Sequence, residues 1–204
     1  MALVLPAQNA ERPSDSSFQR PNDRDEMWEG VLVMSPIADF EHQDIVLELA
    51  SFLVSLVKRA GLGRVFAGCN VSDRDEGWTE NYRIPDVAVF LHDGVGSIHG
   101  SHSLGGPDFL VEVLSDDDRA LEKLPFYAKN GVREALFIRR DPWAIELYRN
   151  VDGILTLLAT SKEENPEAIA CSVVPISLRV VPDPESSRPA IEITQLGGDL
   201  LRRI

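Results

Sequence analysis

Two carboxylates and one lysine are the residues of this sequence whose types could do chemistry together. Glu112 interrupts the apolar run Phe109-Leu-Val-Glu-Val-Leu114, and a lone carboxylate buried in a strand is costly unless a cation or a hydrogen-bond donor meets it. Asp86 follows Pro85 at the head of another apolar run, where the end of a strand could bring it alongside Glu112. Lys123 lies in the helical segment that follows.

Each of these three residues also has a purely structural interpretation. An Asp at a strand start is often a turn or cap residue, so Asp86 by itself is as often structural as functional. Glu112 could lie on an edge strand with that face in solvent. Lys123, taken alone, is more typical of a solvated helix residue. Only their grouping in space would give them a shared function.

Three other polar residues are weaker candidates for the same site. Glu41 and Glu48 share one predicted helix face, but a Glu41 that stabilises the helix dipole and an exposed Glu48 are the simpler interpretations. Tyr127 lies one helical turn after Lys123, where it could position the lysine or simply pack. Packing is the simpler interpretation for Tyr127.

The remaining histidines and the arginine before Asp86 indicate little. Arg83 could meet a phosphate, although a surface arginine is the plainer interpretation. The sequence does not predict a zinc site, because metal-ligand spacing is missing among its four histidines, His42, His92, His99 and His102.

The charge balance sets a condition on any nucleic-acid partner. The 204 residues are 44% hydrophobic and 26% charged, which is ordinary for one domain that buries a core. Against 33 acidic residues stand 20 basic ones, and the net charge of −13 would repel a polyanion at long range. The basic residues form isolated pairs instead of a stripe typical of DNA-binding faces. Part of the negative charge could instead belong to a metal site.

The compartment follows from the cysteines and from the apolar runs. Cys69 and Cys171 are far apart in sequence and fit reduced thiols that pack as small hydrophobes. The start, Met1-Ala-Leu-Val-Leu-Pro6, has no basic region before its short apolar run, and no stretch is long enough to span a bilayer. We therefore expect a cytoplasmic protein with no membrane partner.

Hydrophobic periodicity predicts the elements that must position these residues. A strand is expected over Gly30–Met34, and a helix over roughly 40–60 that Asp39 caps. One further helix is expected over 119–130. Further strands are expected at 64–67 (extending toward Val71), 86–91, 109–114, 135–138, 143–148, 154–158, 176–181 and 190–194. The Asp152-Gly153 turn joins two of these strands as a hairpin.

Three of the predicted segments bear on the site or on the chain end. In the helix over 119–130, one of the three residues Asp116–Asp118 would be the cap, and Pro125 would kink the helix or mark a later start. The glycine-rich segment 93–106 is typical of a mobile loop near a site. Residues 197–204 could form a short helix or a frayed end.

We expect three parts along the chain. Residues 1–25 are rich in Pro, Ser, Asn and Asp and are predicted to be a disordered N-terminal tail. Residues 26–160 form the core. Residues 161–204 form a C-terminal extension whose strands pack onto the core.

Four segments resemble the Uma2 family, a group of restriction endonucleases in the PD-(D/E)XK nuclease superfamily. The similarity covers about residues 27–150, in the right order and spacing. The matching segments are Gly30-Val-Leu-Val-Met-Ser-Pro36 leading to His42-Gln43, Ile84-Pro-Asp-Val-Ala-Val89, Pro107-Asp-Phe-Leu-Val-Glu-Val-Leu-Ser115 and Glu122-Lys-Leu-Pro-Phe-Tyr-Ala-Lys-Asn-Gly-Val-Arg-Glu134. The resemblance implies an α/β fold with a restriction-endonuclease-like core, in which helices flank a mixed β-sheet, here with C-terminal β extensions.

The resemblance also implies a catalytic set. Asp86 and Glu112 would hold Mg²⁺ (or Mn²⁺), with the backbone carbonyl near Val113 completing the metal site. The commonest superfamily pattern has a lysine two residues after the glutamate, where this chain has Leu114. In Uma2 proteins the lysine lies on the following helix, and the matching residue is Lys123. His42 matches a family position, and Glu41 and Glu48 fit a superfamily tendency to draw an acidic ligand from the first helix.

Departures from the family pattern qualify the expected substrate. The stretch between Ser115 and Lys123 is shorter than in the family and holds Asp116-Asp-Asp118 where Ser, Thr and basic residues are usual. Three further acids would therefore lie near the phosphate site.

Three functions remain open at this point. The first is a metal-dependent endonuclease that acts on DNA as a homodimer. A binding or regulatory module that keeps the fold without the chemistry is the second, and a nuclease that acts on RNA is the third.

Overall fold

The computed structural model describes residues 4–6, 24–115 and 119–204. Most of the predicted N-terminal tail and the predicted cap Asp116–Asp118 lie outside the described residues. Within the tail, Val4–Pro6 pairs as a strand with Val31–Val33, and Arg24 lines a pocket of the core.

The strands of the described residues form three sheets, and the predicted α/β class is confirmed. The central sheet has six strands in the order β13 (Ile154–Lys162), β12 (Trp143–Val151), β11 (Glu134–Arg140), β10 (Phe109–Val113), β7 (Val87–Leu91) and β4 (Gly63–Ala67). The second sheet has seven short strands in the order β1 (Val4–Pro6), β3 (Val31–Val33), β2 (Glu26–Trp28), β6 (Tyr82–Arg83), β5 (Asn70–Ser72), β9 (His102–Leu104) and β8 (Ser97–Ile98). The C-terminal sheet has four strands in the order β14 (Ile169–Ala170), β15 (Ile176–Val181), β16 (Ala190–Gln195) and β17 (Leu201–Arg203).

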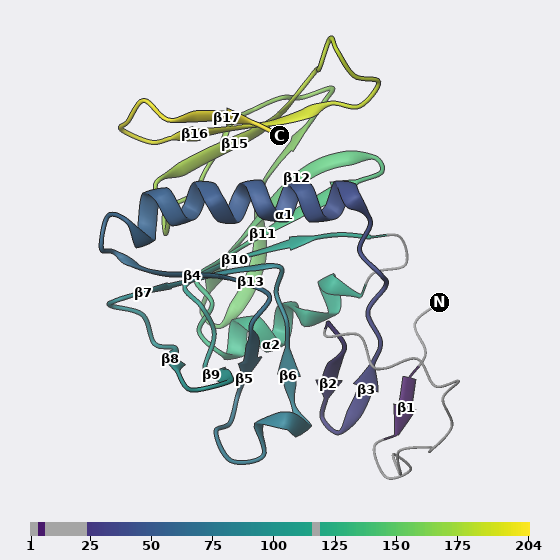
Figure 1. The fold of residues 1–204 in the computed structure, drawn as a ribbon, viewed down its shortest axis with the longest axis vertical. Coiled ribbons are helices and arrows are strands. Elements are labelled where there is room, and N and C mark those ends of the chain that lie inside the picture. The colour runs from purple at the N-terminus through teal and green to yellow at the C-terminus, as the bar shows by residue number, and fades with distance from the viewer. Residues whose placement is uncertain (1–3, 7–23, 116–118) are drawn as a thin grey trace.

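The first helix, α1 (Phe40–Leu53), begins as predicted at Asp39, whose side chain accepts a hydrogen bond from the His42 backbone N–H. It continues as a π-helical turn, η2 (Val54–Lys58). Its apolar face, including Leu49 and Leu53, packs in one core with the central and C-terminal sheets. In Figure 1, α1 crosses the middle of the molecule with the C-terminal sheet above it.

Side-chain alternation on β10 gives the central sheet two different faces. Phe109, Val111 and Val113 join the core around α1, whereas Leu110 packs with Ala120, Tyr127 and Ala128 on the opposite face. Glu112 has the same parity as Leu110 and therefore faces the second helical segment. This explains how a lysine on that segment can reach a strand glutamate.

The second helical segment starts later than predicted. A 3₁₀ turn, η4 (Ala120–Lys123), precedes α2 (Leu124–Lys129), and Pro125 lies in the first turn of α2. Proline is tolerated there because the first helical N–H groups have no intrahelical partner. Of the two interpretations of Pro125, the later start is confirmed.

Three predictions about local structure were wrong. The strand at 64–67 does not extend to Val71, because Gly68 has φ +65° and the chain turns into β5 of another sheet. The segment 93–106, expected to be a mobile loop near the site, instead contains two strands, since β8 and β9 pair within it and β9 pairs with β5. Residues 201–203 form the strand β17, not a helix or a frayed end. The strand β2 was missed. The hairpin turn at Asp152-Gly153 is confirmed, with φ of +52° and +84°.

The C-terminal sheet is attached to the core by a buried carboxylate. Glu134 on β11 is fully buried and accepts hydrogen bonds from the backbone N–H groups of Ser172 and Val173, at 2.9 and 3.1 Å. Arg149 and the Ser172 hydroxyl donate to its other oxygen. The predicted packing of the extension on the core is thus carried by hydrogen bonds as well as by apolar contact.

Among the described residues, the helices are too short or too polar to cross a membrane.

Candidate active site

Strand register brings Asp86 and Glu112 together. In the antiparallel pair β7·β10, Val87 lies opposite Val111 and Ala88 opposite Leu110. Continuing this register by one residue places Asp86 opposite Glu112, and directly opposed residues have Cβ atoms about 4.5–5.5 Å apart. Both carboxylates line one pocket together with Arg24, Ser35, Pro36, Ala38, His42, Ile84, Ser115 and Lys123. β10 lies between β7 and β11, so the edge-strand interpretation of Glu112 was wrong.

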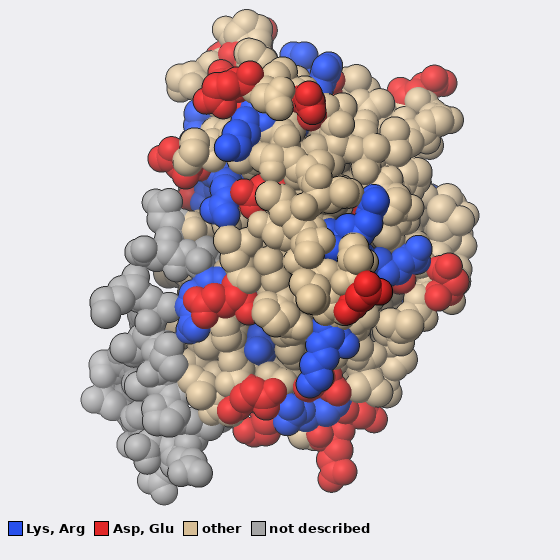
Figure 2. All heavy atoms as spheres, turned by 180° about the vertical axis from the view of Figure 1, so that it is seen from behind, with Lys and Arg blue, Asp and Glu red and all other residues tan. Residues whose placement is uncertain are grey.

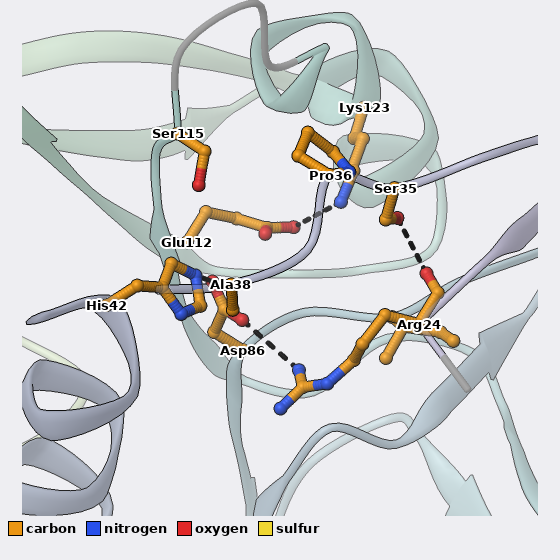
Figure 3. Close-up of a pocket in the computed structure, with 10 residues that line it drawn as sticks. Arg24, Ser35, Pro36, Ala38, His42, Asp86, Glu112, Ser115 and Lys123 are labelled. Carbon is orange, nitrogen blue, oxygen red and sulfur yellow. Dashed lines mark hydrogen bonds and ion pairs between the residues drawn. The ribbon is translucent and has the colours of Figure 1, made fainter. Parts of the chain in front are cut away.

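Asp86 is held from three sides. Its Oδ2 accepts a hydrogen bond from the Val113 backbone N–H at 2.8 Å and lies 3.2 Å from His42 Nε2. Its Oδ1 lies 3.1 Å from Arg24 Nη1. Figure 3 shows Asp86 between His42 and Arg24. These contacts fix the carboxylate in the pocket.

Glu112 is 3% exposed and meets two donors at one oxygen. Lys123 Nζ lies 3.1 Å from Oε1, and Tyr127 Oη donates to the same oxygen at 2.6 Å. Figure 3 shows Glu112 pointing toward Lys123. The surface interpretation of Lys123 was therefore wrong, since the residue is only 8% exposed, and Tyr127 positions the glutamate as well as packing.

A second carboxylate holds Lys123. Glu26 on β2 is 2% exposed, and its Oε1 lies 2.8 Å from Lys123 Nζ. Glu26 itself accepts hydrogen bonds from the Ile84 backbone N–H and the Trp28 indole. The ammonium thus lies between the carboxylates of Glu26 and Glu112.

The electrostatics of the two carboxylates differ. Burial raises the pKa of Asp86, but the hydrogen bond and charge of His42 and the Val113 N–H outweigh it, so this pKa lies below its ordinary value. Burial dominates at Glu112, and the nearby charges of Asp86 and Glu26 add to it. Lys123 and Tyr127 offset only part, and the pKa of Glu112 is raised to about 8.

The comparisons with known proteins show the family of the chain. The sequence model of the Uma2 family, described as "Putative restriction endonuclease", matches residues 11–181. The chain belongs to the Uma2 family. Among solved structures, "a putative nuclease belonging to DUF820" from Anabaena variabilis superposes with a TM-score of 0.58 at 20% identity, covering 75% of this chain and 84% of that one. At this identity the likeness concerns the fold. No curated protein matches the chain.

The donor set of the Uma2 pocket fits a hard divalent cation. Asp86 and Glu112 supply carboxylate oxygens, the ligands that Mg²⁺ and Mn²⁺ prefer. Burial is the main cause of the raised pKa of Glu112, and the negative charges of Asp86 and Glu26 add to it while Lys123 offsets only part. A cation between Asp86 and Glu112 would supply the missing positive charge.

Two of the weaker candidates lie apart from the pocket. Glu41 ion-pairs with Arg140 and Arg188, each at 3.1 Å. Glu48 ion-pairs with Arg202 at 2.6 Å. Neither lines the pocket, so the first helix of this Uma2 chain contributes His42 to the site instead of an acid.

Arg83 is not a surface arginine, and it does not line the pocket of Asp86 and Glu112. It is 6% exposed, and its guanidinium lies 4.4 Å from the Trp28 ring and 4.3 Å from the Phe126 ring. Its Nη1 donates to the Met27 carbonyl at 3.0 Å. Arg83 thus joins β2, which carries Glu26, to α2.

Sequence reasoning missed Arg24 and Glu26. Both lie at the boundary between the expected tail and the core, where no strand was predicted. The strand β2 has three residues, which is too short for its side-chain alternation to be recognised. The signal that remained for a site residue was the pair of acidic residues directly before Met27-Trp28.

Proposed function

We propose that this Uma2 chain is a divalent-metal-dependent endonuclease that hydrolyses DNA phosphodiester bonds. The observation that supports it most is the pocket in which Asp86 and Glu112 lie together with Lys123 Nζ 3.1 Å from Glu112. Membership of a family described as restriction endonucleases points to the same chemistry.

Each residue would have a distinct role. Asp86 and Glu112 would hold Mg²⁺ or Mn²⁺, with the Val113 carbonyl as a third ligand. A cation held there would polarise the phosphate and activate water. Lys123, fixed by Glu26, would orient the attacking water and balance the charge that develops on the phosphate. His42 and Arg24 would orient Asp86.

The test is cleavage of plasmid DNA by the purified chain with Mg²⁺ or Mn²⁺. We expect Glu112→Gln and Asp86→Asn to lower the rate at least about 100-fold, because general acid–base and metal contributions reach that size. Glu48→Gln is the matched control, since Glu48 faces Arg202 outside the pocket. Cleavage by Glu112→Gln at the wild-type rate, or none by the wild type, would refute the proposal.

The charge distribution affects how strongly the chain would attract a nucleic acid. On the face drawn in Figure 2, Lys and Arg side chains lie interspersed with Asp and Glu side chains. Together with the net charge of −13, this predicts that DNA is repelled at long range, so binding would depend on short-range contacts at the pocket. Parallel assays with matched DNA and RNA duplexes and single strands would separate a deoxyribonuclease from a ribonuclease.

Duplex cleavage with one site per chain is easiest for a symmetric pair, so we propose a homodimer. Sedimentation equilibrium with and without a DNA duplex tests this, and a monomer under both conditions would contradict it.

A second candidate is a nuclease-fold binding module without cleavage. It is favoured by the existing partners of both carboxylates, Arg24 and His42 on Asp86 and Lys123 on Glu112. Calorimetric titration of the wild type and Asp86→Asn with Mg²⁺ or Mn²⁺ separates the two candidates. A binding module predicts no metal binding that depends on Asp86, whereas the nuclease predicts binding that Asp86→Asn removes.

A further inference from the structure

A second group of metal-type donors lies at the other end of the seven-stranded sheet. Asp75 follows β5, while His99 and His102 lie on either side of the turn between β8 and β9. Asp75 Oδ1 is 3.4 Å from His99 Nδ1 and 3.1 Å from His102 Nε2. None of the three lines the pocket of Asp86 and Glu112. Figure 1 shows β5, β8 and β9 grouped together, with β6 between them and β2.

Tertiary pairing creates this group. β9 runs parallel to β5 with Asn70 opposite His102, and β8 pairs antiparallel with β9. The pairing places the hairpin with the two histidines beside the segment that leaves β5 toward η3 (Trp78–Glu80). Residue spacing cannot predict a metal site that is assembled from two separate segments. For this reason the histidine spacing did not indicate a metal site in the sequence.

His102 is the buried member, and its ring lacks hydrogen bonds. Its side chain is 6% exposed and stacks between the Trp78 ring at 4.9 Å and the His99 ring at 5.0 Å. Within the described part of the chain, neither of its ring nitrogens makes a hydrogen bond, although Nε2 lies 3.1 Å from Asp75 Oδ1. A buried imidazole nitrogen that makes no hydrogen bond is costly, and a metal ion bound between Nε2 and Asp75 Oδ1 would satisfy Nε2.

His99 is oriented as a metal ligand would be. Its Nε2 lies 3.2 Å from the Ser97 hydroxyl, which leaves Nδ1 facing Asp75. Metal-bound histidines usually donate the other ring N–H to such a partner, which fixes the tautomer.

The donor separations fit a first-row transition metal. Bonds of about 2.1 Å to imidazole nitrogen and carboxylate oxygen place neighbouring donors about 3.0–3.4 Å apart. The separations from Asp75 Oδ1, 3.4 and 3.1 Å, lie in this range, and the three donor atoms lie within 4.8 Å of one another. Asp75 and His99 are 59% and 35% exposed at their side chains, so both can move to close the remaining gap.

We propose that Asp75, His99 and His102 bind a divalent transition metal of the Zn²⁺ class. Two imidazoles select such ions over Mg²⁺, which prefers oxygen ligands. The ion would link the segment after β5 to the β8–β9 hairpin, and water would occupy its remaining coordination positions. This site is separate from the pocket of the proposed nuclease and does not depend on whether the chain cleaves DNA.

The test is calorimetric titration of the full chain with Zn²⁺, in an Asp86→Asn background that removes the other carboxylate site. We expect one Zn²⁺ per chain in this background, at least about tenfold weaker after Ser97→Ala because its partner on His99 is lost. His99→Asn should abolish the binding, and it is exposed enough to leave the fold intact. His92→Asn, at another exposed histidine, is the matched control and should bind as the background does.

A second measurement identifies the ligands directly. On Zn²⁺ addition, the ¹⁵N NMR signals of His99 Nδ1 and His102 Nε2 should shift, while those of His92 should not. The proposal is overturned if the Asp86→Asn chain binds no Zn²⁺, or if His99→Asn binds it with unchanged affinity. Asp75 and the histidines would then form an ion pair only.

Discussion

Tyr127 Oη donates a 2.6 Å hydrogen bond to Glu112 Oε1, the oxygen that Lys123 Nζ also contacts. Helix α2 and strand β10 therefore meet at one carboxylate oxygen, and Glu112 has little freedom to turn. The tyrosine is fully buried, so water cannot replace its hydroxyl.

Tyr127→Phe should lower both stability and site function. The change keeps the ring and removes one buried hydrogen bond, which costs about 0.5–1.5 kcal/mol where Glu112 is protonated and about 1.5–3 kcal/mol where it is ionised. Urea unfolding measures this loss, and Mg²⁺ calorimetry should show weaker binding. Tyr148→Phe is the matched control, because Tyr148 donates to Glu146 outside the pocket. Equal effects of the two variants on Mg²⁺ binding would argue against a positioning role for Tyr127.

Stability without metal should fall as pH rises through the range in which Glu112 titrates. The pKa of this carboxyl is about 8 in the folded chain against an ordinary value of 4.5, so the folded chain holds the extra proton between these values. Stability from this group is fully present below about pH 4.5 and is lost by about pH 8, at no more than about 1.4 kcal/mol per pH unit. Unfolding in EDTA from pH 5 to 9 should show the slope.

Glu112→Gln should flatten that slope, because the amide does not titrate. Saturating Mg²⁺ should also reduce it, since a cation favours the ionised carboxylate. A slope that is the same in wild type and Glu112→Gln would mean that Glu112 keeps an ordinary pKa.

Lys123→Met should destabilise the chain by about 3–5 kcal/mol at neutral pH. It removes the ammonium between Glu26 and Glu112 and leaves buried carboxylates without their charge partner. Thermal and urea unfolding measure the loss. Lys129→Met is the matched control, because the Lys129 side chain is 77% exposed and its ion pair with Asp73 is long, at 3.9 Å. A Lys123→Met chain as stable as the control would contradict the buried cluster.

Glu134→Ala should loosen the C-terminal sheet from the core. The Ser172 and Val173 N–H groups lose their acceptor, and a hydrogen bond to a carboxylate contributes about 1.5–3 kcal/mol. We expect a loss of at least about 2 kcal/mol, with faster amide hydrogen exchange at these residues. Glu48→Ala, at the half-exposed Arg202 pair, should cost less than about 1 kcal/mol. Unchanged exchange at Ser172 would show that the sheet is held by apolar contact alone.

The sequence by itself determined the elements with strong local signals. Helical spacing and the Asp39 cap predicted α1, and the apolar runs predicted β7, β10 and β11. The same reasoning selected Glu112, because a carboxylate in an apolar strand is unusual wherever the strand lies. Elements of two or three residues, such as β2, carry no periodicity that sequence can show.

Only the tertiary structure decided which residues share a site. Strand register sets Asp86 opposite Glu112, and the side-chain alternation of β10 turns Glu112 toward Lys123 and Tyr127. Glu26 reaches the same lysine from β2, and parallel pairing of β5 with β9 gathers the histidine cluster. Register and pairing depend on contacts between segments far apart in the chain, so residue types and local spacing identified candidates but could not assemble them.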